Sequence, residues 1–67
     1  MAAVAVNPNI QGGVPCFAGT RVPVVSLFDH LKLGYTIEQF LQDFPSVGKD
    51  QVIEVLEIAS NSIRIDP

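Results

Sequence analysis

The sequence predicts a small, mainly α-helical domain of three short helices with a short N-terminal β arm or hairpin. Three observations lead to this fold class. Apolar residues recur at helical spacing from Val24 onward. Cap and turn residues divide that region into three segments. The first 23 residues are instead rich in glycine, proline and β-compatible side chains. Three helices with a tight turn between the last two are typical of helix-turn-helix bundles of the homeodomain-like or winged kind.

The length of 67 residues leaves room for a single domain. We expect a β arm and loop over residues 1–23, a three-helix core over 24–62 and a tail over 63–67. A chain this short buries only about 60% of the surface that its unfolded form exposes, so the core will be thin. Cys16 is the single cysteine and has no disulfide partner within the chain. We therefore expect stabilisation by self-association, as a dimer or another homo-oligomer, or by a protein partner.

The composition disfavours several classes of protein. Hydrophobic residues make up 48% of the chain and charged residues 16%, unlike the charge-rich composition of disordered segments. The apolar runs are too short to cross a bilayer, and the start lacks the cationic flank of a signal peptide, which predicts a cytoplasmic protein with no membrane partner. Four cationic side chains stand against seven carboxylates, giving a formal net charge of −3. No basic cluster of the kind that binds nucleic acid is present.

The N-terminal region is expected to be extended. Residues 2–6 are small and β-compatible, and an Asn-Pro-Asn turn follows them. A second short hairpin is predicted to bring residues 15–17 against 20–22, with Gly19 in the left-handed position of a bulged loop. The two prolines of this hairpin lack N–H donors, which places them at sheet edges or strand ends.

The first two helices have clear boundaries. The first begins near Val24 and is followed by Gly34, which suits the left-handed position after a helix. The second begins at the N-cap Thr36, with Gln39 placed to complete a capping box, and ends at Pro45. Their apolar faces comprise Val24, Leu27, Phe28 and Leu31 in the first helix, and Ile37, Phe40, Leu41 and Phe44 in the second.

The third helix is predicted from about Lys49 and carries more apolar surface than two short neighbours would cover. Ile53 and Ile58 lie beside its inward stripe and widen it, so another chain is expected to pack there. Residues 62–67 then switch to a period of two, which predicts an extended tail with an edge open to a partner. The inward stripe comprises Val52, Val55, Leu56 and Ala59.

Few side chains suit catalysis or metal binding. A hydrolase would pair Cys16 with His30 as nucleophile and base. We instead expect Cys16 to be a small buried hydrophobe and His30 a solvated side chain. One His and one Cys fall short of a zinc site, and Glu54 and Glu57 are expected to be a solvated pair. We therefore expect a protein that is not an enzyme and has no metal or cofactor.

The glycine- and proline-rich segment resembles the signature of a small prokaryotic family, domain-of-unknown-function family 433. The residues that carry the resemblance are Gly12-Gly13-x-Pro15 and Gly19-Thr20-Arg21-x-Pro23-Val24, followed by Gly34, Thr36 and Pro45. The resemblance implies an antitoxin, a helix-turn-helix protein of a toxin–antitoxin system encoded beside a PIN-like ribonuclease toxin.

Two functions follow from these observations. The first is a dimerising, non-enzymatic interaction module of antitoxin type that binds and neutralises a PIN-like nuclease. Arg64 is its preferred inhibitory residue, because an arginine aimed at metal-binding carboxylates would block the metal. The residues expected to bind the partner are Ile53, Ile58, Ile63, Arg64 and Ile65.

The alternative is a DNA-binding autorepressor that uses Arg21, Lys49 and Gln51. Gln51 is suited to read adenine, but the carboxylates of the third helix would face phosphates with the wrong sign. Relatives also commonly carry basic residues where this chain has Val14, Ala18 and Ile53, and these departures weaken the DNA-binding alternative.

Arg21 itself has two interpretations. Its guanidinium either braces the loop against its own domain, with Thr20 satisfying a turn amide, or is held rigidly for a phosphate or a carboxylate.

Overall fold

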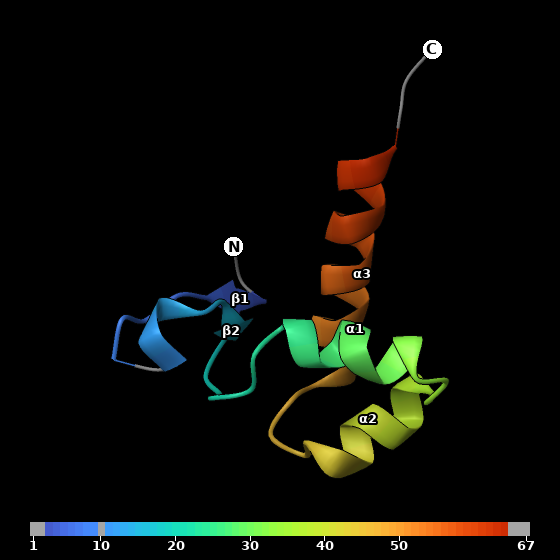
Figure 1. Cartoon of the computed structure of the whole chain (residues 1–67), viewed down its shortest axis with the longest axis horizontal. Helices are drawn as coiled ribbons and strands as arrows, with labels where there is room; N and C mark the ends of the chain where they lie inside the picture. Colours follow the sequence, from blue (N-terminus) through green and yellow to red (C-terminus); the bar gives the residue numbers. More distant parts are fainter. Residues whose placement is uncertain (1–2, 10, 65–67) are drawn as a thin grey trace.

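The computed structural model describes residues 3–9 and 11–64. Along the chain it contains β1 (Val4–Ala5), a 3-10 turn η1 (Gln11–Gly13), β2 (Cys16–Phe17), α1 (Val25–Lys32), α2 (Ile37–Asp43) and α3 (Lys49–Ile63). The predicted fold class, three helices with a short N-terminal hairpin, is confirmed. In Figure 1 the β arm lies beside the helices, and α3 rises away from α1 and α2. Within the described ranges, no helix has both the length and the apolar character needed to cross a bilayer.

The arm is built around β2. β1 pairs with it antiparallel, with Val4 opposite Phe17. On its other side, the Phe17 N–H donates to the Val22 carbonyl at 3.0 Å, which forms the predicted second hairpin. Gly19 closes that hairpin at φ 78°, a conformation that costs glycine little. Of the strand predicted over residues 2–6, only the Val4–Ala5 pair joins the ladder in the part of the chain that is described.

The ends of α1 and α2 follow the predicted caps. Gly34 follows α1 at φ 91°, and the Tyr35 N–H donates back across it to the His30 carbonyl at 3.0 Å, as in a Schellman motif. At the start of α2, the Gln39 N–H donates to the Thr36 hydroxyl at 3.1 Å. The Thr36 N–H donates to the Gln39 side-chain oxygen at 2.7 Å. The capping box is thus complete.

The helix α3 begins at Lys49 as predicted but ends later than predicted. Ser62 is helical, its hydroxyl donates to a carbonyl one turn back at 2.9 Å, and the backbone becomes extended only at Arg64. The predicted switch to a strand at Ser62 is therefore wrong. Extending an existing helix adds one hydrogen bond for each residue fixed, whereas a short strand needs a neighbour to pair with. Ile65 and the two residues after it lie outside the described residues.

A single core joins the arm to the helices. Phe17 of β2 and Phe40 of α2 are both fully buried, with ring centroids 5.9 Å apart. Burying a side chain of this size contributes roughly 1.5–3 kcal/mol. The arm is therefore held by the same core as the three helices. The buried members of the core are Ala3, Phe17, Leu27, Phe40, Val47, Val52 and Val55.

Candidate protein-binding surface

An apolar surface crosses the arm, α1 and α3. It consists of two hollows of about 170 and 260 Å³, and Val24 and Phe28 line both of them. The larger hollow lies toward Val14 and Pro15, just before β2, and the smaller toward the second half of α3. We call this surface the arm–helix face; its residues are Val4, Val14, Pro15, Val24, Val25, Phe28, Val55, Ile58 and Ala59.

Val25, Val14 and Phe28 leave apolar surface exposed on this face. Val24 and Val25 are neighbours at the start of α1 and cannot both point toward the core, so Val25 is 53% exposed. Val14 precedes Pro15, which restricts it to extended conformations, and 38% of its surface remains exposed. Phe28 packs against the core and also lines both hollows.

The structure separates the residues that were expected to bind a partner together. Ile58 lines the smaller hollow. Ile53 is five positions earlier, about 140° around the helix, and therefore flanks the buried stripe on the opposite side. Ile63, 79% exposed, continues that stripe seven positions after Leu56, and Arg64 is exposed beyond it. Among the described members of the set, Ile58 is the one that joins the arm–helix face, whereas Ile65 lies outside the described residues.

Eight of the nine residues of the face, Val14, Val25 and Phe28 among them, were not expected contacts. The exposure of Val25 could have been predicted from the two adjacent valines at the start of α1, because two consecutive residues of a helix do not lie on the same face. The exposure of Val14 and the outer edge of Phe28 depends on how the arm packs against α1, and no local pattern reports that packing.

Two residues of the DNA-binding alternative are engaged within the fold. The Gln51 side-chain oxygen accepts from the Gly48 N–H at 2.9 Å, and its amide nitrogen donates to the Ala18 carbonyl at 3.0 Å. The Lys49 ammonium lies 3.6 Å from a carboxylate oxygen of Glu38. Gln51 thereby links α3 to the hairpin loop of residues 18–21, which we call the arm loop. Both the oxygen and the nitrogen of its side-chain amide are hydrogen-bonded.

The neighbours Thr20 and Arg21 have different environments. The Thr20 hydroxyl donates to the Phe17 carbonyl at 2.9 Å and accepts from the Val22 N–H at 3.0 Å, which confirms its predicted role in the turn. Arg21 is exposed and forms no hydrogen bond or ion pair with another described residue. The bracing contact expected of Arg21 is not formed among the described residues; the loop is instead held to α3 by the bond from Gln51 to the Ala18 carbonyl.

His30 is not the solvated side chain that was predicted. Its side chain is 20% exposed, with Nε2 lying 3.1 Å from a carboxylate oxygen of Asp43 and Nδ1 lying 3.0 Å from the Ser26 carbonyl. The rings of Phe40 and Phe44 stand edge-on, with centroids 5.3 and 5.5 Å away. Both polar partners are acceptors, so both hydrogen bonds form together only when both ring nitrogens carry protons. The packing of α2 against α1 covers this histidine.

Cys16 is buried as predicted, with 4% of its surface exposed and its thiol donating to the Val14 carbonyl at 3.4 Å. No hydrogen bond joins it to His30, so the nucleophile and base of a hydrolase are not brought together. Among the residues that the structure describes, no three His, Cys, Asp or Glu side chains gather as metal ligands.

The predicted solvated pair of carboxylates is correct for Glu57 alone. Glu54 is half-buried, and one of its carboxylate oxygens is enclosed without a hydrogen-bond partner in the described part of the chain. The prediction fails for Glu54 because it lines a small hollow with Ala3 of the arm.

Comparison with known proteins identifies the family. A family profile described as "Protein of unknown function (DUF433)" matches residues 4–59. The chain belongs to the DUF433 family. "Uncharacterized protein y4eO" of Sinorhizobium fredii (strain NBRC 101917 / NGR234) is 35% identical over 49 residues, which are 73% of this chain and 22% of that protein. The crystal structure of a DUF433 member protein from Anabaena variabilis ATCC 29413 is similar in fold, with a TM-score of 0.77 at 18% identity. That match covers 91% of this chain and 60% of the crystallised one.

The DUF433 signature residues divide into two groups in this structure. Most of them shape the backbone: Gly13 and Gly19 have φ of 90° and 78°, and the Pro15 carbonyl accepts from the Val24 N–H at 3.0 Å. Arg21 differs, because its side chain is exposed and lines a separate hollow.

Proposed function

We propose that this DUF433 domain is a non-catalytic protein-binding module whose arm–helix face receives an amphipathic helix of a partner protein. The observation that supports this proposal is the continuity of two apolar hollows through Val24 and Phe28. Continuous apolar surface on a small protein is typical of an interaction site. Covering it contributes about 25 cal/mol for each Å² removed from water, before the cost of association.

The shape of the face favours a helix as the bound element. The two hollows adjoin one another, and an amphipathic helix presents large apolar side chains on one face at positions such as i and i+4. One such side chain would fill each hollow, with Phe28 between them.

We further propose that the partner is the toxin of a toxin–antitoxin pair, a PIN-like ribonuclease, and that the complex is completed by self-association of this chain. The family resemblance supports this part of the proposal. In the proposed complex, Ile63 provides the contact between two copies of this chain. Arg64 inhibits the nuclease by pairing with the metal-binding carboxylates of the nuclease. Protein is favoured over DNA because Lys49 faces Glu38 and the Gln51 amide is bound within the fold.

A binding experiment with the product of an adjacent reading frame tests the proposal. Val25→Lys and Val14→Lys place a charge on the face at exposed positions, and each is expected to weaken binding at least tenfold in calorimetry. Leu33→Lys is the matched control, because Leu33 is 77% exposed but does not line the face. Arg64→Ala is expected to keep binding and lose inhibition of the ribonuclease. The proposal would be overturned if both face variants bound the partner as tightly as the unchanged chain. It would also be overturned if Leu33→Lys lost as much affinity as the face variants.

A further inference from the structure

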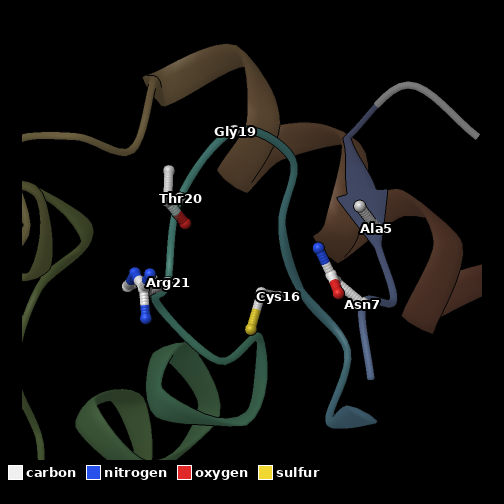
Figure 2. Close-up of a pocket in the computed structure, with 6 residues that line it drawn as sticks. All are labelled: Ala5, Asn7, Cys16, Gly19, Thr20 and Arg21. Atoms are coloured by element: carbon white, nitrogen blue, oxygen red, sulfur yellow. The ribbon is translucent and has the colours of Figure 1, made fainter. Parts of the chain in front are cut away.

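A third hollow, of about 330 Å³, lies at the arm loop and shares no lining residue with the arm–helix face. We propose that this hollow binds a carboxylate group, held by the Arg21 guanidinium and the Asn7 side-chain amide. This site is independent of the proposed protein-binding face. Its lining residues are Ala5, Asn7, Cys16, Gly19, Thr20 and Arg21, as Figure 2 shows.

The charge of the hollow points to an anion. Arg21 is its charged residue, and the lining contains no acidic side chain. Elsewhere on the surface, Lys32 lies 3.4 Å from Asp29 and Lys49 lies 3.6 Å from Glu38, whereas Arg21 has no such partner in the described ranges. A guanidinium offers five N–H donors and accepts no hydrogen bond, so its ligand must be an acceptor.

The backbone that carries Arg21 is fixed before any ligand arrives. The Thr20 hydroxyl bonds to groups on both sides of it, the Phe17 carbonyl and the Val22 N–H. Gly19 on the preceding side has the left-handed conformation that closes the hairpin. Binding therefore orders the arginine side chain but not its loop, which lowers the entropy cost of association.

Asn7 supplies a second donor at the same hollow. Its side-chain oxygen accepts from the Asn9 N–H at 2.9 Å, which orients the amide and leaves the two N–H groups of its nitrogen available as donors. In Figure 2, Arg21 and Asn7 lie on opposite sides of Cys16. An acid bound here would meet the N–H donors of Arg21 on one side and of Asn7 on the other, with Cys16 between them.

The number of charges favours a carboxylate over a phosphate. One guanidinium balances one negative charge, and its parallel N–H groups match the two oxygens of a carboxylate. Phosphate dianions are typically held by several cations or by a row of backbone N–H groups at a helix start. The carboxylate has two possible sources, a free small acid or an acidic side chain of a bound protein.

Amide chemical shifts of the whole chain, measured at constant ionic strength, test the site. Butyrate represents a free acid, N-acetylglutamate amide an acidic side chain, and inorganic phosphate the competing anion. We expect saturable shifts at Gly19 and at the Asn7 side chain with at least one acid. Arg21→Ala should weaken that binding at least tenfold and Arg21→Lys less, whereas the control Arg64→Ala should have no effect.

Tighter binding of butyrate supports the site and assigns it to a small acid, and tighter binding of the glutamate derivative supports it as a contact for an acidic protein. Phosphate that shifts the same groups with equal or higher affinity would overturn the assignment to carboxylates. So would shifts that never saturate with either acid, or that persist in Arg21→Ala. None of these results depends on whether Val25→Lys affects partner binding.

Discussion

Gln51 is the residue that connects the start of α3 to the arm. Its side-chain oxygen caps the helix at Gly48, and its amide nitrogen reaches the Ala18 carbonyl, 33 positions earlier in the chain. A single side chain thus fixes both the first turn of the last helix and the distance between that helix and the arm loop.

Replacing Gln51 is therefore expected to destabilise the protein through two contacts. Gln51→Ala should lower the free energy of unfolding by about 1–3 kcal/mol, because it removes two hydrogen bonds that each contribute about 0.5–1.5 kcal/mol. Gln51→Glu keeps the acceptor for the Gly48 N–H but places a carboxylate against the Ala18 carbonyl, so it should be no more stable than the alanine variant. Urea denaturation measures both. Full stability in Gln51→Glu would show that the bond to Ala18 contributes nothing.

The conformation of Gly34 gives a second expectation. A Cβ there would meet no atom within 4 Å, so a substitution acts only through the backbone at φ +91°. Gly34→Ala should cost about 1 kcal/mol, because an L-residue is disfavoured in the left-handed region. Gly34→Asn should cost less, since asparagine tolerates this region better. If both variants proved as stable as the original chain in urea, the cap would not require a left-handed residue.

Single-residue roles were predictable from the sequence where both partners lie within a few positions. The capping box of Thr36 and Gln39 and the cap at Gly34 are of this kind. His30 and Glu54 were misassigned because the groups that cover them, α2 and the arm, come from other parts of the chain. Burial that results from tertiary packing cannot be predicted from the residues next to the buried one in the sequence.

At the scale of elements, α1 and α2 are joined through His30. The imidazole contacts the rings of Phe40 and Phe44 and bonds to Asp43. The end of α1 and the start and end of α2 followed from cap and turn residues, whereas the start of α1 has no capping side chain. The packing of the two helices against each other depends on these aromatic contacts. The apolar periodicity predicted which face of each helix is buried, but not which rings touch.

The packing of His30 and its hydrogen bond to Asp43 are expected to contribute unequally. His30→Ala should lower the free energy of unfolding by about 2–3 kcal/mol, because it removes a ring enclosed by aromatic neighbours. Asp43→Ala should cost at most about 1 kcal/mol, since the Asp43 side chain is 58% exposed and water screens the interaction. Equal losses in chemical denaturation would assign the stability to the hydrogen bond with Asp43 rather than to the packing.

At the scale of the whole molecule, one thin core supports an elongated shape. The Cα radius of gyration is 12.3 Å and the extents are 40 × 26 × 20 Å, whereas a compact chain of this length has a radius of about 11 Å. Figure 1 shows the reason, since the second half of α3 projects past the other elements. The helical conformation of Ser62 and Ile63, which the sequence did not predict, lengthens this projection by about 3 Å.

A single core implies a single unfolding transition. Phe17→Leu removes part of the arm's contribution to the core and should lower the free energy of unfolding by about 1–2 kcal/mol. The loss should appear equally in far-ultraviolet circular dichroism, which follows the helices, and in an arm amide such as that of Ala18, which donates to the Ala3 carbonyl, followed by NMR. Two separate midpoints would show that the arm unfolds independently of the helices.

Because Cys16 is buried, its thiol can serve as a probe of local opening of the arm. A thiol-modifying reagent reaches the sulfur only after β2 has separated from its neighbours, because 4% of the residue is exposed. The labelling rate, divided by that of the unfolded chain, therefore measures the free energy of that opening. An acid seated beside Arg21 would slow the labelling, so one chemical readout monitors both the motion of the arm and the occupancy of the hollow next to it.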